Sequence, residues 1–319
     1  MAAALPPALV LTAGFGTRLA PLTDLRAKPA MPVAGKPFIF RLLQWLSDQG
    51  VSSVVLNLHH RPDTITRCIG HGTNVGLAVR YSWEPTILGT AGGPRRALPL
   101  LGNRFFVING DTLTGVDLHS ITKEHDTRGA QVTLAVTTNP NPERYGGVVV
   151  NNRSYVQGFV RPGQHIHPHF LGVQLVEASV FGCVSETLPT ASIGGIYDTL
   201  ISEQSDSVYA HPVSASFYDV GTPRDYLATS LAIAEADGLT SLPLGKRSTV
   251  DVSASVIRTA IWDDVIIEAG CRVSDCVITD GVRLPKNTHC ERQVITVRGN
   301  CLLPSRRPLG DLWLYPLDL

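Results

Sequence analysis

The sequence has few charged residues and no excess of either sign. Lys and Arg together number 27, as do Asp and Glu, so the formal net charge of the 319 residues is zero. Charged residues make up 17% of the chain, against about 25% in an average soluble domain. This excludes the broad basic surface that binds nucleic acids or anionic membranes. We therefore expect neither as a partner, and we expect the charges that function requires to be placed locally.

Long hydrophobic runs and paired cysteines are also missing. No apolar run approaches the ~20 residues of a transmembrane helix. The apolar stretch from Ala2 to Ala13 lacks the basic region that begins a secretory signal. The six cysteines include no CxxC pair. Reduced, structural thiols and a cytoplasmic protein are the expectation.

Strand and helix patterns alternate through the first third of the chain. The apolar run Ala8 to Ala13 is typical of a strand buried on both faces of a parallel sheet. Further strands are predicted at Val51 to Leu58, Leu77 to Tyr81 and Arg104 to Asn109, with helices after Pro37, near Asp63 to Ile69 and near Pro94 to Leu98. Strand-rich sequence from Gln131 to Val176 predicts an antiparallel extension, and Pro223 to Ala236 predicts a helix with Thr222 as its N-cap. The fold class is thus α/β, a doubly wound, Rossmann-like mixed sheet.

The end of the chain repeats apolar residues about every six positions. The series is spaced 5, 6, 6, 5, 6, 6 and 5 apart: Val256, Ile261, Ile267, Val273, Ile278, Leu284, Cys290 and Ile295. Such a recurrence predicts a short β-helix of the left-handed, hexapeptide-like kind, with an irregular β-rich tail as the alternative. We expect a catalytic domain over residues 1–237, a linker over 238–249 and the β-helix module over 250–319. Because so few coils are unstable alone, the module should pack on the catalytic domain or on a second copy in a homo-oligomer.

A glycine-rich loop, Gly14-Phe15-Gly16-Thr17-Arg18-Leu19, follows the first strand. Glycines let backbone N–H groups approach a phosphate closely. Leu19 stands where a GxGxxG fingerprint has its third glycine, and no GK[ST] follows, so neither the dinucleotide-binding nor the P-loop pattern is met. Lys28 lies ten residues after Arg18 in a proline-rich segment. Two cations beside a glycine turn suit a triphosphate, although on spacing alone ordinary surface charges are an equal alternative.

Two aspartates stand at the ends of predicted strands, Asp111 after Asn109-Gly110 and Asp219 before Val220-Gly221. Ligands bind beyond the carboxyl ends of strands in open α/β sheets. Mg²⁺ takes one or two carboxylates together with phosphate oxygens and water. Each aspartate singly has a turn or cap role as its alternative. Together with the cations, they predict a site for a metal-bound nucleotide.

Five motifs stand in the order found in sugar-nucleotide pyrophosphorylases, the nucleoside-triphosphate:sugar-1-phosphate nucleotidyltransferases. They are LTAGFGTRLAPLT, KPAMPVAGKP, LGTAGG, NGD and YDVGTP. The chain resembles this family over roughly Ala8 to Ala236, and its LGTAG segment is most similar to that of mannose-1-phosphate guanylyltransferases. The resemblance implies Mg²⁺-dependent transfer of a nucleotidyl group from an NTP, GTP being favoured, to a sugar 1-phosphate, with release of pyrophosphate.

The resemblance also implies roles for individual residues. Arg18 and Lys28 would be catalytic, contacting the departing pyrophosphate and the α-phosphate. The implied nucleotide-binding residues are Thr12, Ala13, Gly14, Gly16, Thr17, Arg18, Leu88, Gly89, Thr90, Ala91 and Asp111. The implied sugar-phosphate-binding residues are Gly146, Arg161 and Asp219, and the implied metal ligands are Asp111 and Asp219.

One segment departs from the family pattern. Val160-Arg161-Pro162 stands where many relatives have Glu-Lys-Pro. Arg161 keeps a phosphate-binding charge, but Val160 cannot accept a hydrogen bond from a sugar hydroxyl, so the sugar stays open. The alternatives are a uridylyl- or thymidylyltransferase acting on glucose 1-phosphate or another hexose 1-phosphate, and a non-catalytic, sugar-nucleotide-binding regulatory subunit.

Overall fold

The computed structural model describes residues 4–164, 166–299 and 303–318. These residues form two compact units. The first comprises the chain up to Gly14, Arg41–Pro62 and Ile69–Tyr218, and the second comprises Phe15–Phe40, Asp63–Cys68 and the chain from Asp219 onward. None of the helices in the described part of the chain has the length and apolar character that a bilayer crossing requires.

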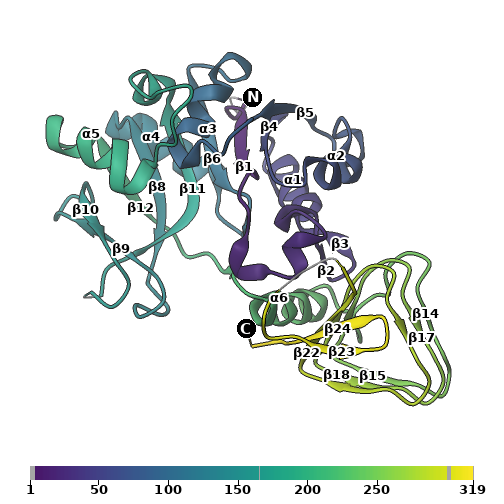
Figure 1. Cartoon of the computed structure of the whole chain (residues 1–319). Helices are drawn as coiled ribbons and strands as arrows, with labels where there is room; N and C mark the ends of the chain where they lie inside the picture. The colour runs from purple at the N-terminus through teal and green to yellow at the C-terminus, as the bar shows by residue number, and fades with distance from the viewer. Residues whose placement is uncertain (1–3, 165, 300–302, 319) are drawn as a thin grey trace. The chain divides into compact units, whose positions relative to one another are not determined.

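The first unit is built around a seven-stranded sheet (Figure 1), in the order β12-β8-β11-β6-β1-β4-β5. Its strands are β1 (Ala8–Leu11), β4 (Ser53–Leu58), β5 (Ala78–Trp83), β6 (Arg104–Asn109), β8 (Val132–Thr137), β11 (His169–Glu177) and β12 (Val208–Pro212). Neighbours are parallel except for β11, which is antiparallel to both β6 and β8. This confirms the predicted mixed α/β sheet, in which β1 has a parallel neighbour on each side.

Shorter elements complete the first unit. Strands β9 (Gly147–Val150) and β10 (Val156–Val160) form an antiparallel hairpin, and β7 (Thr112–Thr114) pairs with β13 (Phe217–Asp219). The helices are α3 (Gly89–Ala97), α4 (Leu118–Arg128) and α5 (Tyr197–Glu203), while α1 (Phe38–Asp48) and α2 (Pro62–Ile69) include residues of both units.

Helix α3 begins at Gly89, so the prediction of a helix near Pro94 to Leu98 was wrong about its start. The glycine-rich sequence before Pro94 has little intrinsic helix propensity. The helix nevertheless forms, because it packs closely on β4 and on the residue after β5. A Cβ atom at Gly93 would lie only 2.9 Å from both Asn57 Nδ2 and Glu84 Oε1. Glycine is therefore the residue that lets α3 approach the ends of β4 and β5.

The second unit holds α6 (Pro223–Ala236) and the C-terminal coils. Thr222 caps α6 as predicted, since its Oγ1 accepts a hydrogen bond from the Asp225 N–H at 3.2 Å. The coil strands are β14 (Thr249–Val250), β15 (Ser255–Ile257), β16 (Ala260–Ile261), β17 (Ile266–Ile267), β18 (Arg272–Ser274), β19 (Val277–Ile278), β20 (Arg283–Leu284), β21 (His289–Glu291) and β22 (Gln293–Val297). They stack as three parallel ladders, β14-β17-β20, β15-β18-β21 and β16-β19-β22.

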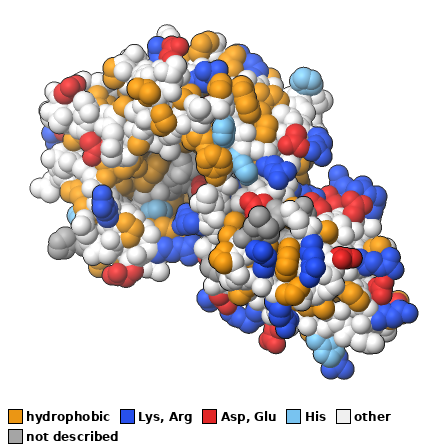
Figure 2. Space-filling view, in the orientation of Figure 1, with side chains coloured by type: hydrophobic (Ala, Val, Ile, Leu, Met, Phe, Trp, Pro, Cys, Tyr) orange, Lys and Arg blue, Asp and Glu red, His pale blue; other side chains and the backbone are white. Residues whose placement is uncertain are grey.

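Each coil of this β-helix is 17 residues long, as the pairing of Val256 with Val273 and of Val273 with Cys290 requires. The predicted apolar series forms the core, with Val256 at its partly buried edge. Acidic and basic side chains gather over the outside of the coils (Figure 2). A terminal hairpin of β23 (Arg307–Leu309) and β24 (Leu312–Pro316) adds to β22 in antiparallel fashion. The predicted β-helix module is thus confirmed.

Candidate active site

The backbone at Thr12, directly after β1, is held by the neighbouring strand β4. Its backbone N–H donates to Asn57 Oδ1 at 2.6 Å, and its hydroxyl donates to the Asn57 carbonyl oxygen. Both residues are buried. Two residues later, a Cβ atom at Gly14 would meet no described atom within 4 Å. Packing therefore does not demand glycine at this position, which fits a backbone that a ligand approaches.

The same asparagine connects the first turn to the LGTAGG segment. Asn57 Nδ2 donates to Glu84 Oε1 at 2.7 Å, and the other carboxylate oxygen of Glu84 accepts from the Leu88 N–H at 2.9 Å. Glu84 is fully buried just after β5. The structure thus brings Thr12 and Leu88 into one hydrogen-bonded string, which we call the Thr12–Leu88 string: Thr12, Asn57, Glu84 and Leu88. Asn57 and Glu84 were not predicted from the sequence, although a lone Asn in the apolar run Val54-Val55-Leu56-Asn57-Leu58 was a usable signal.

The start of α3 is held by the segment around Thr190. Gly89 has a φ of 78°, and the N–H groups of Ala91 and Gly92 both donate to the Thr190 carbonyl, at 2.9 and 3.3 Å. Thr90 Oγ1 accepts from the Ser192 N–H at 2.8 Å. The Ala91 N–H is therefore committed to the protein, and Thr90, an exposed residue, presents this segment to solvent.

Asp111 lies beside the end of β1 because Gly110 packs directly on that strand. The Gly110 N–H donates to the Leu11 carbonyl at 3.0 Å, and a Cβ atom at Gly110 would lie only 2.3 Å from that oxygen. Asp111 Oδ1 accepts a hydrogen bond from the Thr112 hydroxyl at 3.3 Å. The Asn109-Gly110-Asp111 motif thus places a carboxylate next to the turn that contains Thr12.

Gly146 and Arg161 meet at one end of the β9–β10 hairpin. Val160 pairs with Gly147, and a Cβ atom at Gly146 would lie 2.8 Å from the Val160 carbonyl oxygen. Arg161 follows directly and is exposed. The structure therefore brings together the two residues of the first unit for which a sugar-phosphate role was predicted.

A cluster of three rings, those of Tyr145, His169 and Phe217, lies beside Gly146. The Tyr145 ring lies 4.7 Å from the His169 ring and 5.8 Å from the Phe217 ring, centroid to centroid. His169 Nδ1 lies 3.3 Å from the Gly146 carbonyl oxygen. The backbone at Gly146 is therefore positioned by neighbours on both sides.

The chain passes into the second unit between Gly14 and Phe15. There Gly16 has a φ of 62°, and a Cβ atom on it would come within 2.9 Å of Thr23 Cγ2. The Thr23 hydroxyl donates to the Gly16 carbonyl at 3.1 Å. That Cβ would also lie 3.6 Å from Lys28 Cβ, so the glycine turn and Lys28 are neighbours.

The two predicted catalytic cations differ in exposure. Arg18 is exposed in the short 3₁₀ turn Thr17–Leu19. Lys28 lies in the turn Lys28–Ala30 and is buried, with 9% of its surface exposed. Water screens a cation on a largely buried side chain less than one on an exposed side chain, so its attraction to a nearby anion is stronger.

Asp219 is the first residue of the C-terminal segment of the second unit, and its carbonyl oxygen accepts from the Thr229 hydroxyl of α6 at 3.5 Å. No group of three or more His, Cys, Asp and Glu side chains in the described parts of the chain is arranged to hold a metal ion. A metal ion held by Asp111 or Asp219 would therefore take few of its ligands from such side chains. Mg²⁺ would tolerate that donor set, because it usually keeps several waters and binds substrate phosphates.

Comparison with known proteins agrees with these motifs. The sequence model of the nucleotidyl transferase family matches residues 7–236. The mannose-1-phosphate guanylyltransferase of Mycobacterium tuberculosis is 28% identical over 300 residues, covering 89% of this chain and 83% of that protein. Mannose-1-phosphate guanylyltransferase 1 of Arabidopsis thaliana is 30% identical over 310 residues, covering 90% and 85%.

Solved structures show the same fold. HddC from Yersinia pseudotuberculosis complexed with GMP-PN superposes with a TM-score of 0.62 at 23% identity, covering 72% of this chain and all of that one. A putative glucose-1-phosphate thymidylyltransferase from Bacillus anthracis gives 0.60 at 21% identity, covering 76% of this chain and 98% of that one. Since the family match spans residues 7–236, the chain belongs to the nucleotidyl transferase family and is a nucleotidyltransferase enzyme.

Proposed function

We propose that this enzyme transfers a guanylyl group from GTP to mannose 1-phosphate, forming GDP-mannose and pyrophosphate. The observation that carries the proposal is the similarity along about nine tenths of the chain to relatives named mannose-1-phosphate guanylyltransferases. The GMP-PN complex of HddC, which shares the fold, supports a guanine nucleotide as the donor.

The proposed chemistry needs no general base. The phosphate oxygen of the sugar 1-phosphate is already anionic, and it attacks the α-phosphorus in line as the bond to pyrophosphate breaks. Catalysis then consists of positioning and of neutralising charge. We assign Arg18 to the departing pyrophosphate and the buried Lys28 to the α-phosphate. Bound Mg²⁺, with Asp111 and Asp219 as its proposed protein ligands, would supply further neutralisation of the triphosphate.

We assign binding roles in the same terms. Thr12 to Gly14, together with Gly16 and Thr17, offer backbone groups to the triphosphate, while Leu88 to Ala91 contact the base and ribose. The Thr12–Leu88 string supports this assignment for the first unit, because it fixes the first turn relative to the start of α3. Gly146, Arg161 and Asp219 are the proposed contacts to the sugar phosphate.

The organisation of the chain is part of the proposal. Residues 1–237 act as the catalytic domain, 238–249 as a linker and 250–319 as a module through which copies of the chain associate. We expect a cytoplasmic protein with no nucleic-acid or membrane partner.

The test is a pyrophosphate-release assay on the purified full chain. A matrix of common NTPs and hexose 1-phosphates is assayed with Mg²⁺ and again with excess EDTA. We expect the highest kcat/KM for GTP with mannose 1-phosphate, and no turnover in EDTA. Preference for UTP or dTTP would overturn the guanylyl assignment. No turnover with any pair, together with tight binding of a sugar nucleotide, would identify a regulatory subunit instead.

A further inference from the structure

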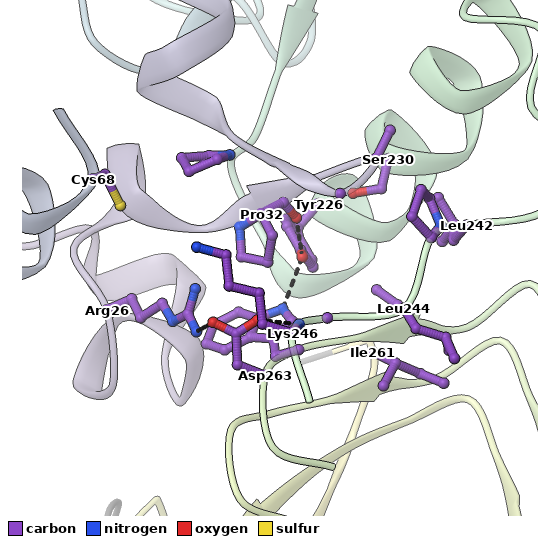
Figure 3. Close-up of a pocket in the computed structure, with 17 residues that line it drawn as sticks. Arg26, Pro32, Cys68, Tyr226, Ser230, Leu242, Leu244, Lys246, Ile261 and Asp263 are labelled. Carbon is purple, nitrogen blue, oxygen red and sulfur yellow. Dashed lines mark hydrogen bonds and ion pairs between the residues drawn. The ribbon is translucent and has the colours of Figure 1, made fainter. Parts of the chain in front are cut away.

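The segment that carries Lys28 lies against the C-terminal coils within the second unit. A cavity of about 150 Å³ separates parts of them (Figure 3), and its lining includes Arg26 and Pro32 from this segment, Tyr226 from α6, and Lys246 and Asp263 from the coil side. On one side of the cavity, a Cβ atom at Gly35 would lie 2.9 Å from the Pro243 ring. The Lys28 segment, defined here as residues 26–37, is thus packed between α6 and the coils.

Arg26 joins this segment to two successive coils. Its Nε donates to Asp280 Oδ2 at 2.8 Å, and its Nη2 donates to Asp280 Oδ1 at 2.6 Å and to Asp263 Oδ2 at 2.8 Å. Asp263 and Asp280 are 17 residues apart, one full coil, and the Asp263 N–H also donates to Asp280 Oδ1 at 3.0 Å. One guanidinium group therefore binds the same corner of the β-helix in two successive coils.

Aromatic side chains make a second link between the same parts. The guanidinium carbon of Arg26 lies 5.1 Å from the centre of the Trp262 ring. Trp262 Nε1–H donates to the Tyr226 hydroxyl at 2.8 Å, and that hydroxyl donates to the Pro32 carbonyl oxygen. Trp262 and Tyr226 are fully buried. The Lys28 segment is therefore held at Arg26, before Lys28, and at Pro32, after it.

The Arg26 ion pairs differ from those that decorate the outside of the coils. The Arg26 side chain is only 18% exposed, and its geometry toward Asp280 is bidentate. Arg247 also binds Asp264 in a bidentate manner, across the same 17-residue step, but its side chain is 69% exposed. Exposed pairs contribute little to stability even with this geometry, whereas a bidentate pair that is largely shielded from solvent restricts the positions of both side chains.

We propose that Arg26 is a positioning residue for Lys28, and that the first two coils of the β-helix are in consequence a working part of the active site. This rests on the proposed function in one respect, the role of Lys28 at the α-phosphate. Lys28 is two residues from Arg26, and the Lys28–Ala30 turn between the two anchor points is short. When Asp263 and Asp280 hold Arg26, the backbone that carries Lys28 is held in place before the nucleotide arrives.

The experiment compares Arg26→Gln and Asp280→Asn with a matched control, Arg247→Gln, in the full chain. Small displacements of a catalytic group cost up to about 100-fold in rate. We expect kcat to fall about 10- to 100-fold in both test variants, with the KM for the sugar phosphate changed less than about twofold. Arg26→Lys should restore part of kcat, and Arg26→Gln combined with Asp280→Asn should cost no more than either alone. The control should keep the wild-type kcat.

A second readout does not depend on turnover. Hydrogen exchange of the backbone amides in residues 26–37 should be faster in Arg26→Gln and Asp280→Asn than in Arg247→Gln, with the thermal midpoints of the three within a few degrees. Wild-type kcat together with unchanged exchange in the test variants would overturn the positioning role. If the wild-type enzyme turns over no substrate pair, the proposed function fails, and the exchange comparison still decides whether Arg26 orders the Lys28 segment.

Discussion

The Asn57 side-chain amide donates to the Glu84 carboxylate at 2.7 Å, with the two residues 3% and 0% exposed. This bond joins Asn57, near the end of β4, to Glu84, the residue that follows β5. Because Asn57 also binds Thr12 and Glu84 also binds the Leu88 N–H, one buried pair sets the distance between two predicted nucleotide-binding segments.

Replacing Glu84 should therefore destabilise the first unit. Glu84→Ala leaves the Asn57 amide and the Leu88 N–H as buried donors without an acceptor, and each such donor costs about 1–3 kcal/mol. We expect the free energy of unfolding, measured by urea denaturation, to fall by about 2–6 kcal/mol. Glu186→Ala is the control, because that carboxylate is exposed where it pairs with Arg95. Equal losses in the two variants would contradict the role of the buried pair.

Removing the carboxylate of Asp111 should affect catalysis far more than stability. We expect Asp111→Ala to lose about 3 kcal/mol or more of transition-state stabilisation, which is a fall of at least ~100-fold in kcat/KM. Asp63→Ala, at an exposed carboxylate that pairs with Arg67, should keep normal kinetics. A near-normal kcat in Asp111→Ala would show that the metal is held by other groups.

Stability should fall as the pH is lowered, in part because of His125. Burial lowers the pKa of this imidazole below its ordinary value, and the positive charge of Arg104 acts in the same direction, although Glu177 and Asp126 oppose them. Below about pH 6.5 the unfolded chain therefore binds a proton that the folded chain does not, so the free energy of unfolding decreases. His211, whose pKa is also lowered by burial, adds to the effect.

The check is urea denaturation at about pH 7.5 and 5.5. His125→Gln should reduce the loss of stability between the two conditions, whereas His71→Gln, at an exposed position, should leave it unchanged. An undiminished loss in His125→Gln would mean that other groups cause it.

Thiol reactivity should separate the described cysteines by burial. Burial raises the pKa of Cys276 to about 12, and Cys271 and Cys290 are also buried in the coils, whereas Cys183 is exposed. A thiol reagent at pH 8 should label Cys183 rapidly and the three buried residues only after unfolding. The assay uses a Cys68→Ser and Cys301→Ser background, because Cys68 is half-buried and residue 301 lies outside the described residues. Loss of the fast phase in Cys276→Ser, with retention in Cys183→Ser, would refute this assignment.

Patterns of apolar residues predicted most of the fold. The series from Val256 to Ile295 predicted the coils, because its apolar residues recur about every six positions and point into the core of the β-helix. The apolar run at β1 predicted a central strand. Helix α4 was not predicted, since its buried face is formed by Leu118 and Ile121 with a histidine, His125, in place of a third apolar residue. The pattern of hydrophobic residues in α4 therefore does not show the repeat of a helix.

The motifs predicted the candidate site less completely than the fold. Residues within one motif, such as Gly16 and Arg18, were predicted as site residues from the resemblance of that motif to the family pattern. Asn57, Glu84 and Arg26 were not predicted, because their importance comes from partners distant in sequence. Arg26 binds residues 237 and 254 positions away, and local sequence carries no signal for such pairs.

The uniform coil length of the β-helix limits how this module tolerates changes in length. The corner residues Arg258, Asp275 and Arg292 all have φ near +50° and recur at 17-residue steps. An insertion or deletion of one whole coil leaves every later residue on its own face and corner. A single-residue insertion within a coil instead moves the following inward side chains off the core, unless the extra residue bulges out at a corner. Variation in the length of this module should therefore come in steps of about one coil, or be confined to the corners.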